Sequence, residues 1–160
     1  MEKQNIRELL VREDRLRKQI ISPVFLDIGL TPGQGQARIL NRLLDKDQVT
    51  QKELGDRCHF DAPTMSRNLD KLEKLGFLTR EINPECRRSY LICLTKLGRI
   101  KAQEIRTTFE QFDEIILEDV VVDELEVFYN VLSKICDNLE KNKNFFTKQL
   151  SQKDEEESNV

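Results

Sequence analysis

Residues 49–76, VTQKELGDRCHFDAPTMSRNLDKLEKLG, decide the fold, because they predict two short helices joined by a tight turn. Thr50 and Glu53 form the pattern of a capping box, in which the hydroxyl bonds the Glu53 amide and the carboxylate reaches back. The second helix follows almost at once, over about Ala62–Leu75, because Asp61 can cap it. Two helices connected in this way form a helix-turn-helix.

The second helix has one apolar and one polar side. Its apolar residues are Met65, Leu69, Leu72 and Leu75. The residues left as candidates to face a groove of DNA are Thr64, Ser66, Arg67, Asn68 and Lys71. Arg67 can grip guanine through two hydrogen bonds, Asn68 can pair with adenine, and the others suit phosphate. For this helix taken alone, the alternative is an ordinary amphipathic helix with a solvated polar side.

A β-hairpin with a basic tip is expected next. Residues 77–82 and 89–94 are rich in β-branched and aromatic types, and NPECRR separates them. Such a hairpin beside a helix in the major groove can reach phosphates or the minor groove, which makes Arg87 and Arg88 candidates for DNA contacts. Residues 62–101 hold nine Lys or Arg against four acids, although the whole chain has a net charge of −3. Positive charge is therefore concentrated around these elements.

Long amphipathic helices are expected on both sides of this core. One runs from about Ile6 to Asp27, with a kink or a restart near Pro23, and two more follow Thr95 and Asp123. Between them, Thr31–Gln34 should start a further helix through its own capping box. The outer helices have wide apolar stripes that one copy of the chain does not cover, which predicts an obligate homodimer.

Composition bounds the class of protein. Of 160 residues, 34% are charged and 38% hydrophobic, which suits one compact domain with extensive helical surface. No apolar run approaches the roughly 20 residues of a membrane-spanning helix, and the charged start does not resemble a secretion signal. A cytoplasmic protein is therefore expected.

The sequence offers no candidate catalytic residues. The single histidine, His59, stands beside Cys58, but a transition-metal site needs three or four ligands at workable spacing. The sequence has no nucleophile motif, glycine-rich phosphate loop or HExxH, so no catalytic residue, metal or cofactor is expected. The four cysteines form no CxxC and are interpreted as free thiols. Cys86, near the tip of the hairpin, is the candidate for a redox-active thiol.

The run from Val49 to Arg99, which contains SRNLDKLEKLGF and NPECRRSYLICLT, resembles the winged-helix core of the MarR family of bacterial regulators. With its flanking helices the likeness extends from about residue 5 to residue 145. It implies a mainly α fold with a small β-hairpin wing. The expected division is a winged helix-turn-helix domain over residues 31–104 and a helical dimerisation region over residues 1–30 and 105–150. Residues 151–160 are acidic and expected to be disordered.

The resemblance also implies a function. A homodimer would place a recognition helix in each major groove of a palindromic operator in double-stranded DNA, with a wing in each flanking minor groove. Family members typically repress nearby genes until a small molecule or an oxidant acts on them. Arg88 resembles the family position that pairs with the recognition-helix acid, here Asp70. The alternative partner of Asp70 is Lys74, one turn along the same helix.

Two residue types depart from the family pattern. Cys86 stands where the wing usually has Asp, and Gly33 and Gly35 occupy a helix start that often borders the effector pocket. The alternative functions are therefore a thiol-based redox-sensing regulator and a winged-helix module for protein contacts. A protein-binding face should show aromatic anchors, whereas the second helix of the motif has Thr, Ser, Arg, Asn and Lys.

Overall fold

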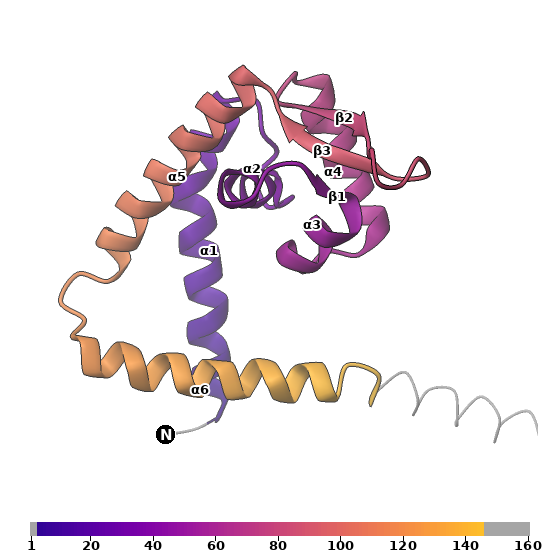
Figure 1. Cartoon of the computed structure of the whole chain (residues 1–160). Coiled ribbons are helices and arrows are strands. Elements are labelled where there is room, and N and C mark those ends of the chain that lie inside the picture. The colour runs from indigo at the N-terminus through magenta and orange to yellow at the C-terminus, as the bar shows by residue number, and fades with distance from the viewer. Residues whose placement is uncertain (1–2, 146–160) are drawn as a thin grey trace, which may run out of the picture. The chain divides into compact units, whose positions relative to one another are not determined.

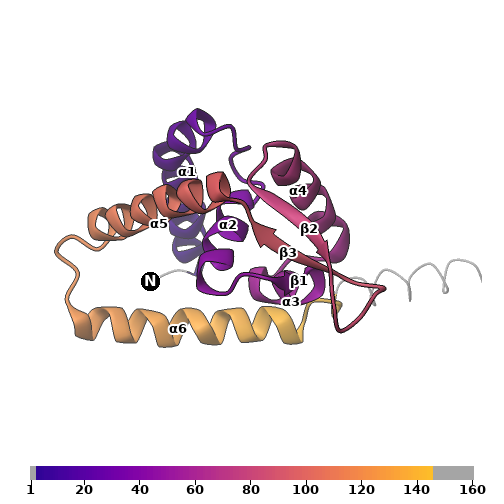
Figure 2. The same cartoon turned by 45° about the horizontal axis from the view of Figure 1, so that its top comes forward.

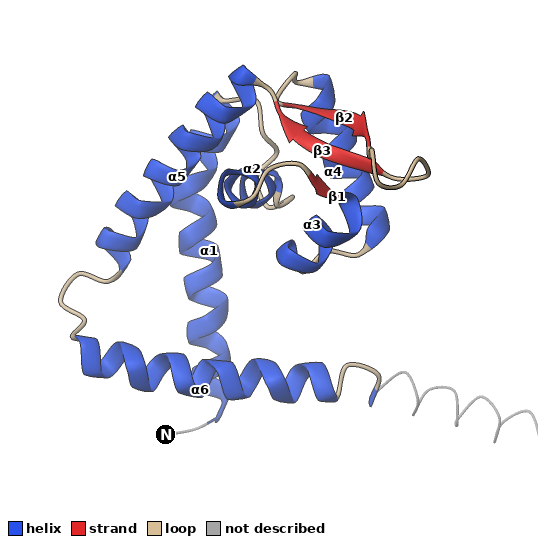
Figure 3. Ribbon diagram, in the orientation of Figure 1, coloured by secondary structure: helices blue, strands red, loops and turns tan. Residues whose placement is uncertain are grey.

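The computed structural model describes the backbone of residues 3–145 and the side chains of residues 5–145. It forms two compact units, Met1–Asp113 and Glu114–Val160, which are described separately. The expected disordered tail, residues 151–160, lies outside the described residues. In chain order the elements are α1 Lys3–Asp27, α2 Gln36–Asp45, β1 Val49–Thr50, α3 Gln51–Cys58, α4 Ala62–Lys74, β2 Leu78–Ile82, β3 Tyr90–Leu94, α5 Lys96–Ile116 and α6 Val122–Lys141 (Figures 1 and 3).

The helix-turn-helix is confirmed as α3 and α4. The Thr50 hydroxyl accepts a hydrogen bond from the Glu53 amide at 3.2 Å, and the Asp61 carboxylate accepts one from the Thr64 amide at 2.7 Å. These bonds satisfy amide donors that a helix start leaves without intrahelical partners. The reciprocal half of the first capping box is not made, because the Glu53 carboxylate pairs instead with Lys46 at 2.7 Å.

The hairpin is also confirmed, as the antiparallel pair β2 and β3, in register from Leu78 opposite Leu94 to Ile82 opposite Tyr90. A short strand that the sequence analysis did not expect, β1, pairs with the other edge of β3, so the sheet order is β1-β3-β2. Strand β2 packs against α4, and Figure 2 shows the hairpin beside that helix. We call residues 78–94 the wing and residues 83–89 the wing tip.

The core of the first unit fixes α4 and the wing to one another. Leu54, Met65, Leu69, Leu72, Leu78, Ile92 and Ile105 are among its fully buried side chains. Gly76 (φ +74°) ends α4. The start of α5 lies directly against the residue before the wing, because a Cβ on Gly98 would come within 1.6 Å of the Phe77 carbonyl oxygen. Thr95 completes this joint by accepting from the Gly98 amide at 2.9 Å and donating to the Gly76 carbonyl at 2.6 Å.

The expected start of the second helix is wrong. Helix α2 begins at Gln36, and Thr31–Gly35 form a loop in which Gly33 (φ +75°) and Gly35 (φ +80°) have left-handed backbone angles. Those angles do not continue a right-handed helix, and glycine adopts them without steric cost. Helix α1, in turn, runs through Pro23 without interruption.

The second unit contains α6, whose N-terminus is closed by the Glu124 carboxylate accepting from the Val121 amide at 3.2 Å. None of its side chains is buried. Its exposed apolar residues are Val122, Val127, Phe128, Tyr129, Val131 and Leu139. Within residues 3–145, no helix is long and apolar enough to cross a membrane.

Candidate nucleic-acid interface

The outer face of α4 presents Pro63, Arg67, Asp70 and Lys74, which are exposed and follow one another at helical spacing. Arg67 stands out from this face, and its guanidinium donates to the Thr64 hydroxyl at 3.3 Å. Thr64 and Ser66, which were both predicted to contact DNA, are half-buried at the edge of the face. Lys74 was not among the predicted DNA contacts, although its spacing of seven residues from Arg67 indicates the same side of the helix.

The prediction that Asn68 faces a groove of DNA is wrong. Its side chain is only 4% exposed, and its amide donates to the carbonyl oxygens of Gln34 at 2.8 Å and Thr64 at 3.1 Å. Lys71, one turn further on, is half-buried and donates to the Thr31 hydroxyl. The loop before α2 therefore covers this side of α4, which the sequence analysis assigned to DNA.

The predicted pair between Asp70 and Arg88 is also not formed. Asp70 instead pairs with Arg80 on β2, at 2.5 Å, and the same guanidinium bonds Glu73. Arg80 is the middle residue of β2 and its side chain is 20% exposed, so it reaches both carboxylates from the strand that packs on α4. One arginine thus joins the wing to α4 and neutralises two acids on or beside the outer face of that helix.

The wing tip is held by its own backbone and by Asn83, a buried residue that sequence reasoning did not single out. The Asn83 amide donates to the Ser89 carbonyl at 3.0 Å, and its side chain donates to the Ser89 hydroxyl at 3.1 Å and accepts from the Glu85 amide at 2.9 Å. Arg87 and Arg88 are exposed on this ordered turn. In the described part of the chain, no acid lies within ion-pair distance of either guanidinium.

The four cysteines are free thiols, as expected, but their surroundings differ. Burial raises the pKa of Cys58, and burial together with the nearby Glu81 raises the pKa of Cys93 to about 11. Cys86 is exposed at the wing tip, where hydrogen bonds from the Arg88 amide and then from Ser89 lower the pKa of its thiol. No cluster of three potential metal ligands occurs among the residues described.

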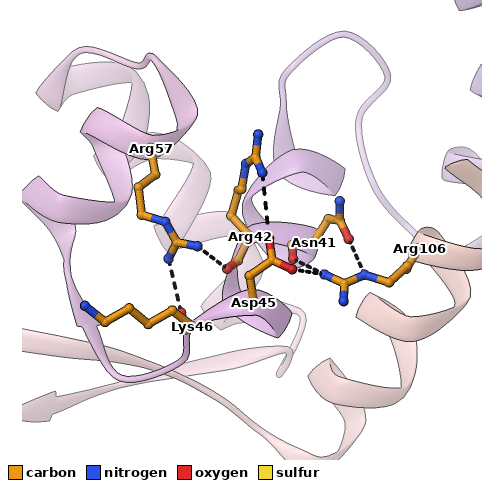
Figure 4. Close-up of polar contacts among 6 residues, drawn as sticks. All are labelled: Asn41, Arg42, Asp45, Lys46, Arg57 and Arg106. Carbon is orange, nitrogen blue, oxygen red and sulfur yellow. Dashed lines mark hydrogen bonds and ion pairs between the residues drawn. The ribbon is translucent and has the colours of Figure 1, made fainter.

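Two arginines attach the neighbouring helices to the C-terminal end of α2 (Figure 4). Arg57 of α3 donates to the Arg42 carbonyl at 3.2 Å. Arg106 of α5 donates to both oxygens of Asn41 at 2.9 Å and pairs with Asp45 at 2.5 Å. The Arg42 carbonyl also accepts from the Lys46 backbone amide at 3.2 Å, so Arg57 is a second donor to the same oxygen. Helix α2 is thereby fixed both to the helix-turn-helix and to the long helix α5.

The first unit also contains a pocket of about 490 Å³, lined by α1, the loop before α2, α2 itself, Phe60 and α5. Four rings and four cations contribute to its lining: Phe25, Phe60, Phe109, Phe112, Arg17, Lys18, Arg38 and Arg42. The Arg17 guanidinium lies 5.5 Å from the centre of the Phe112 ring. A Cβ on Gly35 would lie 2.1 Å from the Phe60 ring, so glycine at this position lets that ring close against the loop.

Comparison with known proteins agrees with this geometry. Residues 28–89 match the MarR family. The Bacillus subtilis protein YdgJ, an uncharacterized HTH-type transcriptional regulator, is 27% identical over 106 residues. That alignment covers 66% of this chain and 65% of YdgJ, so the chain spans less than two thirds of that relative's length.

Solved structures share the whole fold. A MarR protein from Peptoclostridium difficile has a TM-score of 0.76 at 20% identity, over 89% of this chain and 92% of its own. MepR from S. aureus, solved as a DNA complex, has a TM-score of 0.74 at 20% identity, over 87% and 99% of the two chains. The winged helix-turn-helix elements, the match of residues 28–89 to the MarR family and the fold shared with these structures agree with one another.

Proposed function

We propose that this protein is a sequence-specific regulator of transcription that binds double-stranded DNA through α4 and the wing. The observation that carries the proposal is that Arg67 is exposed on α4 and that Arg87 and Arg88 are exposed on the wing, which Arg80 ties to that helix. An α-helix fits the major groove, and an arginine on a neighbouring hairpin fits the minor groove. The fold shared with MepR, solved with DNA, supports this reading.

The exposed residues have distinct expected roles. Arg67 reads guanine through two hydrogen bonds, and Thr64 and Ser66 contact phosphate at the edge of the groove. Arg87 enters the minor groove, where the negative potential is greatest over A·T-rich sequence, and Arg88 contacts the backbone beside it.

The test is selection of bound fragments from random DNA, followed by affinity measurements at several salt concentrations. A palindromic site should be enriched. If two protomers neutralise about 8 to 10 phosphates, log affinity should fall with log salt with a slope of about −7 to −9. Arg15→Ala, which removes an exposed cation from α1, is the control for net charge and should leave the slope unchanged. Retention of a protein partner with no enriched DNA would favour the protein-interaction module instead.

We further propose that the protein acts as a homodimer. Helix α1 exposes Leu9, Val11, Ile20 and Leu26, and α6 exposes a second apolar set without burying any side chain. Exposed apolar surface of this extent is typical of an interface between subunits. Sedimentation at micromolar concentration should give a dimer, and Phe128→Asp on α6 should shift it toward monomer. A folded wild-type monomer under those conditions would contradict the proposal.

We also propose that the regulator is a repressor released from DNA by a small aromatic acid. The pocket suits such a molecule because its rings offer stacking surfaces. Arg38, which has no carboxylate partner among the described residues and donates to the Cys58 carbonyl at 3.3 Å, offers charge-assisted hydrogen bonds. Benzoate should weaken DNA binding by the wild type and have less effect on Arg38→Ala, whereas cyclohexylmethanol, whose ring is saturated and which carries no charge, should have none. Equal effects of the two compounds would argue against this pocket chemistry.

A further inference from the structure

The buried contacts of Asn68 join the recognition helix to the loop that precedes α2. The side-chain oxygen of Asn68 accepts from the side-chain NH2 group of Gln36 at 3.2 Å. The side-chain nitrogen of Asn68 donates to the backbone carbonyls of Gln34 and Thr64. Gln36 is equally buried, at 3% exposed, and its own oxygen accepts from the Thr31 backbone amide at 2.9 Å. Each polar atom of this amide pair therefore has a partner.

Such a pair is costly to bury unless it is fully hydrogen-bonded. The other buried positions of α4 are apolar, so packing alone would be served by a leucine at position 68. A second tie lies one turn further along α4, where Lys71 donates to the Thr31 hydroxyl. The loop is thus hydrogen-bonded to two successive turns of α4, at Asn68 and at Lys71. Both residues lie on the side of the helix next to the outer face that carries Arg67.

We propose that Asn68 and Gln36 are positioning residues, an amide lock that sets the depth and rotation of α4 relative to the rest of the first unit. This deepens the proposed function and depends on it, because α4 is the element that reads DNA. Thr31 and Gln36 also line the 490 Å³ pocket, so the wall of the pocket and the recognition helix share one hydrogen-bonded connection.

The test uses Gln36→Met, Asn68→Leu and the double variant, which nearly keep side-chain volume and remove the hydrogen bonds. Each single variant should weaken binding to the selected operator about tenfold, and the double variant should be no weaker. The loss should spread over all base pairs that α4 reads. Stability should partly recover in the double variant, because apolar replacement of both partners leaves fewer unpaired groups. Operator affinity should not recover with it.

Two DNA results would overturn the lock. Affinity that follows the unfolding free energy across the three variants would make the pair merely structural. A loss confined to one base pair in Asn68→Leu, with Gln36→Met unaffected, would return Asn68 to base reading. Ile105→Val, a buried core change on α5, is the control for destabilisation and should leave operator affinity unchanged.

Hydrogen exchange on the full chain without DNA separates this inference from the proposed function. Asn68→Leu should speed exchange across residues 31–36, and Gln36→Met should speed it across the first two turns of α4, beyond the effect of Ile105→Val. Changes confined to the mutated segment would overturn the lock even if the protein binds DNA. If the wild type enriches no DNA sequence, the proposed function fails, and the exchange result alone decides whether the lock exists.

Discussion

The cations of the first unit fall into two groups that the sequence does not separate. Arg57, Arg80 and Arg106 are held by carbonyls or carboxylates of the protein itself, whereas Arg67, Arg87 and Arg88 stand exposed on α4 and the wing tip. The anchored group fixes the spacing of helices and strands. The exposed group keeps its charge and donors available for phosphates and base edges. One set of arginines therefore holds the helices and strands in place, and a different set is available to contact DNA.

Arg80→Ala should have the largest effect, because it removes the anchored arginine that ties β2 to α4. Asp70 and Glu73 would face the DNA without a counter-charge, and the wing would lose its tie to α4. We expect operator affinity to fall by about 3 kcal/mol, roughly 150-fold, in an anisotropy titration.

Rescue would sharpen this prediction. Asp70→Asn with Glu73→Gln should restore part of the affinity in the Arg80→Ala background, because the repulsion disappears although the tie does not. Arg99→Ala removes a comparable arginine that pairs with Asp47 at 2.6 Å, and it should cost far less. Equal losses for the two arginine variants would mean that the wing tie has no special role.

Arg67→Ala tests the exposed group. It should cost about 2 kcal/mol on the operator and relax sequence preference at one base pair in each half-site. Binding to random DNA should change much less. The measurement is a competition titration against operators changed at single positions, and a uniform loss on every sequence would contradict a base-reading role.

Lys71 and Lys74 offer a matched pair on one helix. Lys74 is exposed on the outer face, while Lys71 is half-buried and bonded to Thr31. Lys74→Ala should reduce the salt slope by about 1 per protomer and cost about 0.5 to 1 kcal/mol, whereas Lys71→Ala should leave the slope nearly unchanged. If Lys71→Ala reduced the slope as much, Lys71 would belong to the exposed group.

Local signals in the sequence were sufficient for the helix-turn-helix and the hairpin. Capping residues Thr50 and Asp61, the apolar spacing of α4 and the left-handed Gly76 determine elements by contacts within a few residues. Apart from the start of α2, which the left-handed glycines at positions 33 and 35 delay, the predictions that failed depended on contacts between distant segments. Asn68 was assigned to DNA because helical periodicity alone cannot show that residues 31–36 lie across that side of α4.

The same limit explains the mistaken partner of Asp70. Arg80 and Arg88 both belong to the wing, and charge alone does not distinguish them. The hairpin register does, because it places position 80 opposite Ile92 in the middle of β2, the strand that packs against α4, and leaves position 88 in the turn beyond the strands. A sequence argument that first assigned the register could have preferred Arg80.

Cys86 gives the smallest expected effect, because its thiol touches none of the anchored arginines. Hydrogen bonds from the Arg88 amide and from Ser89 favour the thiolate and lower the pKa of Cys86, so the thiolate forms at lower pH than in an ordinary thiol. Alkylation by iodoacetamide, followed by peptide mass spectrometry, should therefore reach its half-maximal rate at lower pH for Cys86. Cys58 and Cys93, whose pKa values burial raises, should react slowly across the same range.

Bound operator should protect Cys86 from alkylation if the wing tip enters the minor groove. Cys86→Ser should change operator affinity less than about threefold, within the usual range for a surface substitution. A half-maximal pH above that of an ordinary thiol would contradict the lowered pKa of Cys86. Protection by random DNA as strong as that by the operator would contradict a specific contact between the wing tip and the operator.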